Sequence, residues 1–187
     1  MDVKEAINKR RAYRSLEPTE ITPDIINSLA GSAQLSPSCF NNQPWRYVFV
    51  TAPEKLIEMH SALSQGNEWD KAASMIIAVF SKKENECLIK DREYYLFDTG
   101  MATAFIILRA TEIGLVAHPI AGFSPKKTRE ILEIPDEMNV ITLVIVGKHS
   151  SNMNPLMNEG QIEVEKERPE RLQVNKFVFM NKYMANK

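Results

Sequence analysis

The chain has 187 residues, of which 44% are hydrophobic and 25% charged, and its net charge is −1. This length suits one domain with its own core, and the near-neutral charge excludes a general attraction to nucleic acid or to an anionic membrane. The N-terminal residues lack a signal-peptide apolar stretch, and the longest apolar run, residues 101–108, is shorter than the roughly 20 residues that span a bilayer. We therefore expect a soluble, cytoplasmic protein.

The first half of the chain predicts three helices and one strand. A short amphipathic helix covers residues 2–10, and Thr22 followed by Pro23 opens a second helix with a cap and a proline at the first helical position. Two prolines and small polar residues make residues 35–44 a loop. A strand over residues 47–51 and a helix over residues 53–63 follow.

The second half contains the most apolar segments. The pattern predicts a buried strand over residues 75–80 and a long, almost uniformly apolar helix over residues 96–113, which Gly114 ends. Residues 118–123 read as a loop. A helix from Ser124 to Ile134, a strand over 140–146, a polar and mobile segment over 150–160 and a charged, then apolar tail complete the chain. The order is mixed α/β without Rossmann alternation.

Two groups of arginines lie far apart in the sequence. Arg10, Arg11 and Arg14 end the first helix, and Arg168 and Arg171 lie in the tail. Guanidinium groups suit phosphate because they offer paired donors and a permanent charge. If the groups meet in space, both can bind one dianion; the alternative is a solvated basic surface.

Residues 36–43 and residues 114–123 are the other candidate binding segments. The first clusters hydroxyl and amide groups, which can hydrogen-bond the polar edge of a flat ligand, although an ordinary turn has the same composition. The second is apolar yet loop-like, and its Gly122 permits close approach of the backbone to a ligand. His118 lies there without a partner carboxylate, so we interpret it as structural rather than catalytic.

The cysteines and histidines favour no other chemistry. Cys39 and Cys87 form neither a CxxC motif nor a disulfide framework, as is usual in a reducing cytosol, and a nucleophile at Cys39 is a minor alternative. The three histidines lack the spacing of a metal site, so we expect no metal.

In chain order, several short motifs resemble those of the nitroreductase family. They are RRAYR at residues 10–14, SPSCFNNQPWRYVF at 36–49, DTG at 98–100, GL at 114–115, HPIAGF at 118–123, VIVGK at 144–148 and RPERL at 168–172. Each motif alone is unspecific, whereas the ordered set is specific. The resemblance implies an α+β (mixed α/β) fold with a central, mostly antiparallel sheet flanked by helices, a long buried central helix and a C-terminal tail that spans a dimer.

The resemblance also implies one FMN-binding domain over residues 1–187, with the flavin at the interface of a homodimer. The residues that it assigns to the phosphate and the ring edge are Arg10, Arg11, Ala12, Arg14, Lys148, Arg168 and Arg171. Those that it assigns to the ring are Asn67, Pro119, Ile120, Ala121 and Gly122, and those that reach the flavin from the partner subunit are Pro37, Ser38, Cys39, Asn41 and Gln43. No catalytic side chain is implied, because flavin N5 carries the chemistry.

The chain departs from the family pattern at three places. Ala12 stands where a serine or threonine is usual, which leaves only its backbone N–H for phosphate. The lysine that often follows the asparagine has no match, since Asp70 falls near its place and Lys71 follows. The stretch between Phe80 and Asp98 is short, which predicts a more open active site.

The implied activity is that of an FMN-dependent oxidoreductase. It uses NADH or NADPH to reduce an electron-poor small molecule, such as a nitroaromatic or a quinone, by ping-pong hydride transfer through flavin N5. A specialised flavin reaction on the same fold, or a flavin-binding protein with little turnover, are the alternatives. We expect neither nucleic acid nor a membrane as a partner.

Overall fold

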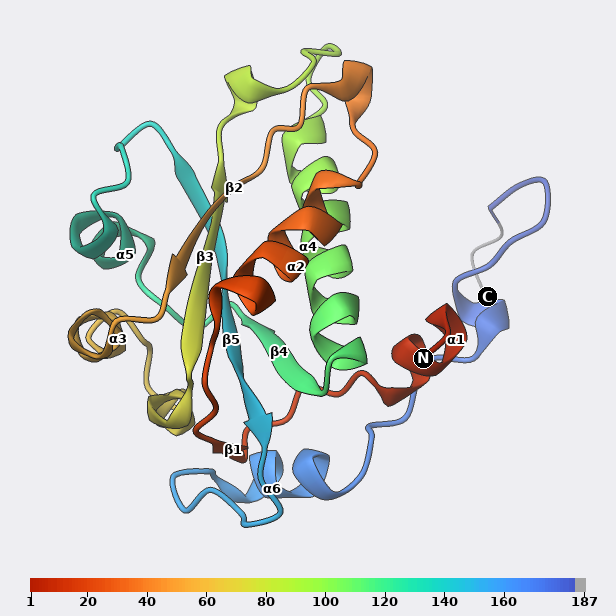
Figure 1. The fold of residues 1–187 in the computed structure, drawn as a ribbon. Helices are drawn as coiled ribbons and strands as arrows, with labels where there is room; N and C mark the ends of the chain where they lie inside the picture. Colours follow the sequence, from red (N-terminus) through yellow and green to blue (C-terminus); the bar gives the residue numbers. More distant parts are fainter. Residues whose placement is uncertain (184–187) are drawn as a thin grey trace.

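A five-stranded antiparallel sheet forms the centre of the protein (Figure 1). The computed structural model describes residues 1–183, so the last four residues of the predicted domain lie outside the described residues. The strands are β1 (Leu16–Glu17), β2 (Arg46–Val50), β3 (Met75–Ser81), β4 (Leu115–Ile120) and β5 (Asn139–His149). β5 is the central strand. β3 pairs with one of its edges and β4 with the other, β1 pairs with the end of β5 at Lys148 and His149, and β2 pairs with β3.

Helices cover both faces of this sheet (Figure 1). They are α1 (Val3–Lys9), α2 (Pro23–Gln34), α3 (Pro53–His60), α4 (Tyr94–Glu112), α5 (Pro125–Leu132) and α6 (Glu159–Lys166), with short 3₁₀ turns η1 (Cys39–Asn41), η2 (Glu68–Ala72), η3 (Lys83–Asn85) and η4 (Val174–Lys176). α2 and α4 lie on one face, and α3 and α5 on the other. α1 and the C-terminal segment project together from the side of the body.

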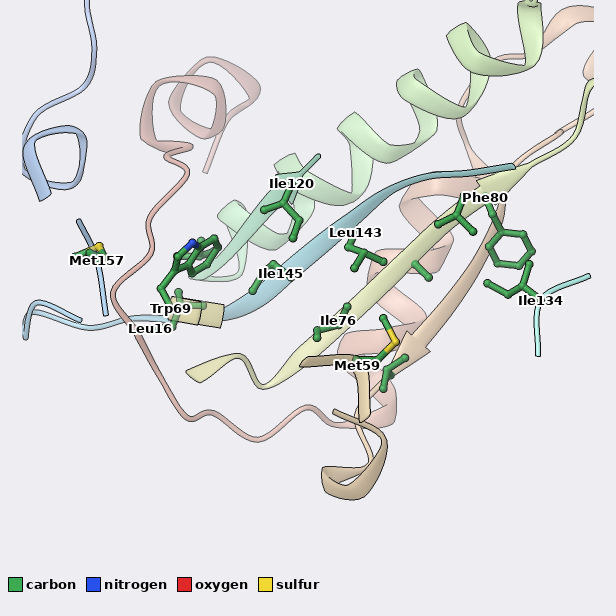
Figure 2. Close-up of a cluster of buried hydrophobic side chains, with 14 residues drawn as sticks. Leu16, Met59, Trp69, Ile76, Phe80, Ile120, Ile134, Leu143, Ile145 and Met157 are labelled. Carbon is green, nitrogen blue, oxygen red and sulfur yellow. The ribbon is translucent and has the colours of Figure 1, made fainter. Parts of the chain in front are cut away.

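The alternation of side chains along β3 explains why its sequence is apolar throughout. All seven residues of β3 are buried. Ile77 and Val79 pack in the cluster under α2 and α4, whereas Ile76 and Phe80 point into the opposite cluster with Met59 of α3 (Figure 2). A strand that is covered on both faces buries every side chain, which stabilises the sheet by about 25 cal/mol for each Å² of apolar surface removed from water.

The long helix α4 is buried on one side and exposed on the other. Ala102, Ile106 and Ala110 face the sheet and are fully buried, while Phe97 is 62% and Phe105 39% exposed. The predicted central helix is confirmed. Phe97 and Phe105 on its outer side remain exposed to solvent in the single chain.

The predicted helix boundaries rest on local chemistry that the structure confirms. The hydroxyl of Thr22 accepts a hydrogen bond from the backbone N–H of Ile25, and Ser124 caps α5 through Lys127 in the same way. Gly114 follows α4 with φ of +83°, a left-handed conformation that glycine adopts without a side-chain clash.

The predicted loop over residues 118–123 is wrong for its first part, because residues 115–120 form β4. Pro119 cannot donate a backbone hydrogen bond, which disfavours a strand when the sequence is considered alone. β4 pairs only with β5, so it is an edge strand, and an edge strand tolerates a proline. The segment predicted to be polar and mobile, residues 150–160, overlaps at its end with a helix. α6 begins at Glu159, after a capping box formed by Asn158 and Gln161.

The expectation that the cysteines form no disulfide is wrong. Cys39 and Cys87 are bonded to each other, with 6.2 Å between their Cα atoms. Cys39 precedes β2 and Cys87 follows β3, and the antiparallel pairing of these strands brings Arg46 opposite Phe80. The two segments therefore leave the same end of the sheet, although 48 positions separate the cysteines in sequence, a spacing that carries no local signal.

Among the helices of residues 1–183, none has both the length and the apolar character needed to cross a membrane.

Candidate functional site

The two distant groups of arginines meet in one pocket. A cavity of about 230 Å³ is lined by Arg10, Arg11, Ala12, Arg14, Val164, Arg168, Pro169 and Arg171. Five of these eight described residues are arginines and none is acidic. The convergence predicted from the sequence is therefore found, with four of the arginines partly buried and Arg171 exposed.

Helix α6 and the segment after it hold the pocket together through backbone contacts. The Arg11 guanidinium donates to the carbonyl oxygen of Val164 at 2.8 Å, and that of Arg168 donates to the carbonyl oxygens of Asn8 and Arg10 at 2.7 and 2.8 Å. Arg11 thus binds the C-terminal segment, and Arg168 binds the N-terminal segment.

A buried carboxylate fixes the backbone between the arginines and β1. Glu165 is 5% exposed, and its two oxygens accept hydrogen bonds from the backbone N–H groups of Arg14 and Ser15 at 2.8 and 2.9 Å. The carboxylate fixes the direction in which Arg14 leaves the backbone.

The positive charges that line the pocket are not matched by negative charges in its lining. Burial, followed by the charges of Arg168, Arg171 and Arg11, lowers the pKa of Arg10. Burial also lowers the pKa of Arg14, against which Glu165 acts. The Nε of Arg14 is a buried donor without a hydrogen-bond partner. An anion with several acceptor oxygens would relieve both the repulsion and the unmade hydrogen bond, so the residues present fit a phosphate group.

A stacked column leads from the arginine pocket toward the sheet. The guanidinium of Arg14 lies over the Trp69 ring at 5.7 Å, and Trp69 stacks on His118 with 4.8 Å between ring centroids. Trp69 is fully buried, and its Nε1 donates to Oδ1 of Asn67 at 3.3 Å. One aromatic ring therefore joins the arginine pocket to the predicted ring-binding residue Asn67.

His118 has a structural place in this column. Its Nδ1 lies 3.1 Å from the carbonyl oxygen of Tyr13. Burial is the main cause that lowers the pKa of His118 to about 4, so the ring is neutral near pH 7. This agrees with the interpretation of His118 as structural rather than as a general base.

Asn67 and Gly122 form a tight corner beside Trp69. The side-chain amide of Asn67 donates to the carbonyl oxygen of Gly122 at 2.8 Å. A Cβ atom on Gly122 would collide with that amide, which explains the need for glycine here. Pro119 and Ala121 are exposed, whereas the side chain of Ile120 points into the core (Figure 2). Of the predicted strip, Ile120 thus offers a ligand only its backbone.

The loop of residues 37–43 lies at the other end of the sheet from the arginine pocket (Figure 1). The Ser38 hydroxyl accepts from the Gln43 backbone N–H at 2.9 Å, and Asp98 at the start of α4 accepts from the Cys39 N–H at 2.8 Å. Phe40, Asn41 and Gln43 all have positive φ, at 49°, 57° and 51°. Such strained conformations cluster at binding sites. Within one chain, however, this loop does not join the pocket.

Lys148 lies apart from the other predicted phosphate ligands. Its Nζ pairs with Glu17 at 2.8 Å across the β1–β5 ladder, and it is absent from the described lining of the pocket. Sequence reasoning missed Trp69 and Glu165, which organise the site. The capping box before α6 was the one signal for Glu165; no local pattern pointed to Trp69.

Comparisons with known proteins show the family and the fold. A model of the nitroreductase family matches residues 7–68 and 58–148. An oxygen-insensitive NADPH nitroreductase of Helicobacter pylori strain J99 is 24% identical, over 86% of this chain and 93% of its own. The structure of a nitroreductase family protein from Clostridium novyi NT is 28% identical with a TM-score of 0.75, over 81% of this chain and 87% of its own. A solved oxidoreductase containing FMN has a TM-score of 0.85 at 24% identity, over 100% of this chain and 95% of its own.

The family match covers the arginines at the end of α1, the strained loop, the Asn67 corner and the central sheet. The solved structures have the same fold over most or all of the chain. This protein therefore belongs to the nitroreductase family and is an oxidoreductase.

Proposed function

We propose that residues 1–187 form one domain that binds FMN and uses NADH or NADPH to reduce an electron-poor small molecule. The observation that carries the proposal is the pocket of five arginines without an acidic residue in its described lining. FMN ends in a phosphate dianion, and one of the solved proteins with this fold is an oxidoreductase containing FMN. When bound, FMN supplies the acceptance and donation of hydride between the nicotinamide and the acceptor.

The phosphate end would be held by the arginine pocket. Arg10, Arg14 and Arg171 supply the free cationic donors, whereas Arg11 and Arg168 chiefly hold the pocket walls through backbone carbonyls. The backbone at Ala12 remains a further donor. Lys148 is a secondary candidate because its ammonium group already pairs with Glu17.

The ring end would lie along Asn67 and the segment after β4. Trp69 and Gly122 orient the Asn67 amide, whose oxygen and nitrogen each retain one further hydrogen-bonding position for the edge of a flavin. Pro119 and Ala121 are exposed on the same stretch of chain and can border a flat ring. Arg14 lies over the Trp69 ring, which contacts Asn67, and we place it by the N1 and O2 edge of the flavin.

The proposed enzyme is a homodimer, in which the strained loop of one chain completes the site of the other. Apolar side chains on three separate elements are more than half exposed: Val3 and Ile7 of α1, Phe97 of α4, and Leu172 and Phe177 of the tail. Surface of this kind is favoured at obligate interfaces. The pairing would bring Pro37, Ser38, Cys39, Asn41 and Gln43 to the partner's flavin.

An absorbance spectrum of the purified protein, before and after anaerobic NADH or NADPH, tests the proposal. We expect flavin bands at about 370 and 450 nm that the nucleotide bleaches. Steady-state rates against donor and acceptor should then give parallel double-reciprocal lines, because the two substrates use one pocket in turn. A colourless protein that does not take up added FMN would contradict the cofactor assignment, and intersecting lines would contradict the ping-pong order.

A further inference from the structure

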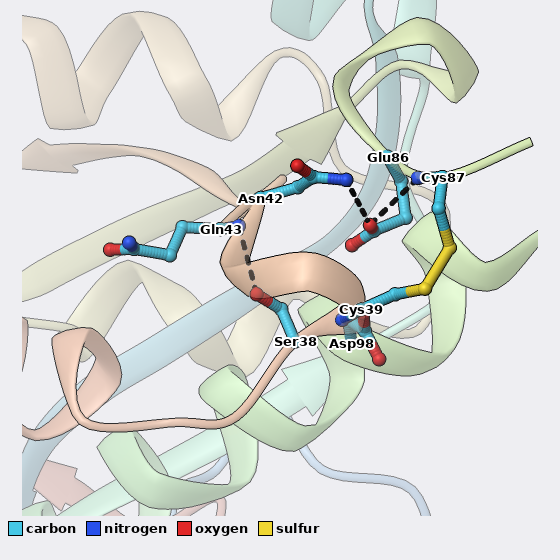
Figure 3. The surroundings of a disulfide bond; sticks show 7 residues. All are labelled: Ser38, Cys39, Asn42, Gln43, Glu86, Cys87 and Asp98. Carbon is cyan, nitrogen blue, oxygen red and sulfur yellow. Dashed lines mark hydrogen bonds between the residues drawn. A yellow bond between two sulfur atoms is a disulfide. The ribbon is translucent and has the colours of Figure 1, made fainter.

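Two cysteines and two buried carboxylates gather where β2 begins and β3 ends (Figure 3). Cys39 and Cys87 are joined by the disulfide, and the Glu86 carboxylate lies beside them. One ligand atom from each of these three residues lies within 4.8 Å of the others. Because the two sulfur atoms are bonded to each other, these side chains could hold a metal ion only after reduction, and none of the three belongs to the arginine pocket.

Glu86 has one oxygen held in place and one left free. It is 5% exposed. Its Oε1 accepts hydrogen bonds from Nδ2 of Asn42 at 2.9 Å and from the backbone N–H of Cys87 at 2.7 Å. Its Oε2 is buried without a hydrogen-bond partner. A buried acceptor without a donor needs an explanation, and either a proton shared with the Asp98 carboxyl group or a bound cation supplies one.

Asp98 adds a second negative charge to the same corner. It is 1% exposed, and its Oδ2 accepts a hydrogen bond from the backbone N–H of Cys39 at 2.8 Å. In residues 1–183, neither Glu86 nor Asp98 forms an ion pair with a lysine, arginine or histidine. Two buried carboxylates without a cation favour the binding of one.

We propose that Cys39, Cys87 and Glu86 bind a thiophilic divalent cation of the Zn²⁺ type when the disulfide is reduced. Two thiolates and one carboxylate are ligands that Zn²⁺ accepts, and three protein ligands leave a fourth, open position. Asn42 and Asp98 are positioning residues, since Asn42 orients the Glu86 carboxylate and Asp98 holds the backbone of Cys39. The spacing of histidines in the sequence could not reveal a site without histidine.

The disulfide and the metal site are mutually exclusive states of this corner. A dithiol reductant supplies two electrons and two protons, the S–S bond breaks into two thiols, and the reductant becomes its own disulfide. The cation then displaces one proton from each thiol and forms two metal–sulfur bonds. Cys39 and Cys87 are both partly exposed in the single chain, and in the proposed dimer, where Cys39 would face the partner's flavin, Cys87 is the side open to reductant and metal.

Titration of the full-length protein with Co²⁺ tests the site, because tetrahedral cobalt thiolates absorb at longer wavelengths than flavin. One sample is reduced anaerobically with a phosphine, which is then removed, and the other stays oxidised. We expect one Co²⁺ per chain in the reduced sample, displaced by Zn²⁺, and none at the same concentration in the oxidised sample. Absence of binding to the reduced protein, or equal binding to both, would overturn the proposal.

Variants then assign the ligands. Cys39→Ser and Cys87→Ser should abolish the cobalt–thiolate absorption, and Glu86→Gln should weaken binding by about tenfold or more. Glu84→Gln is the matched control, because Glu84 lies exposed in η3, two positions from Glu86. A loss in Glu84→Gln as large as that in Glu86→Gln would overturn the assignment.

A measurement on the wild-type protein removes the dependence on variant folding. Zn²⁺ should slow the alkylation of both thiols in the reduced protein, and unchanged alkylation rates would contradict the proposal. The proposal does not rest on FMN, so its failure would leave the proposed oxidoreductase function untouched.

Discussion

The arginine pocket and the loop of residues 37–43 lie at opposite ends of the sheet and are held in different ways. The pocket is built inside one chain on buried groups, with Glu165, Trp69 and His118 beneath its arginines. The loop has an exposed phenylalanine, Phe40, and left-handed backbone. A site for a charged group must be rigid before the ligand arrives, whereas a segment that meets a partner can keep its strain until assembly. Mutations of the buried groups beneath the arginines should therefore affect stability, whereas mutations in the loop should affect turnover.

The largest effect is expected at Asp70, next to Trp69. Asp70 is fully buried, its carboxylate oxygens lack hydrogen-bond partners, and burial raises its pKa to about 7. The ionised form is disfavoured in the folded state, so stability is lost as the pH rises from about 4 through 7. Asp70→Asn should raise the free energy of unfolding at pH 8 by up to about 4 kcal/mol and change it little below pH 4. Urea unfolding at both pH values measures this difference.

Equal effects of Asp70→Asn at the two pH values would show that ionisation is not the cause. Asp136→Asn is the control, because its fully exposed side chain should leave stability unchanged at both pH values.

His118 should give the opposite pH dependence. Its pKa is lowered to about 4, below the ordinary value of 6.5, so protons bind to the unfolded chain first as the pH falls. Stability is then lost by about 3 kcal/mol between pH 6.5 and 4. The Asp70 contribution rises over the same range and masks this slope in the wild type. The slope should emerge in Asp70→Asn and vanish in Asp70→Asn/His118→Gln; a slope that persists in the double variant contradicts the assignment.

The arginines should affect ligand affinity more than stability. Arg10→Ala and Arg171→Ala should each weaken FMN binding by about 1.5–3 kcal/mol, the range of a charge-assisted hydrogen bond. Lys126→Ala is the matched control, because this cation is 81% exposed and lies outside the lining of the pocket. Flavin fluorescence titration gives the affinities. If Lys126→Ala costs as much as the two arginine variants, general charge rather than the pocket binds the phosphate.

The smallest effect on stability is expected in the loop. Phe40 is 86% exposed with φ of 49°, so Phe40→Gly relieves backbone strain and removes little packing. The relief is offset by the greater freedom of glycine in the unfolded chain, and stability should change by less than about 1 kcal/mol. The rate of NADH- or NADPH-dependent turnover should fall if the loop completes the partner's site, as proposed above. Wild-type turnover in this variant would separate the loop from the active site.

The sequence predicted elements whose signals are local. Thr22 and Pro23 marked the start of α2, and the apolar run after Ser74 marked β3. The arginine convergence was also predictable, since a charge pattern repeated at both ends of the chain suggests one shared ligand. β4 was missed because Pro119 acts locally as a strand breaker, whereas only the tertiary pairing with β5 shows that its strand is an edge.

Long-range contacts were the other limit. The disulfide links residues that only the β2–β3 pairing brings together, and Trp69 reaches its place through a 3₁₀ turn without a sequence signature. Such contacts depend on the tertiary structure, and no short stretch of sequence predicts them.

The arginine pocket unites the two ends of the chain, with a consequence for truncated chains. Arg168 reaches back over 158 positions to the carbonyl oxygen of Arg10. The five strands of the sheet end at His149, before the second group of arginines begins at Arg168, so the sheet can be complete in a chain that has only the first group. The proposed phosphate site therefore needs both groups of arginines, and a chain truncated after β5 would have only the first.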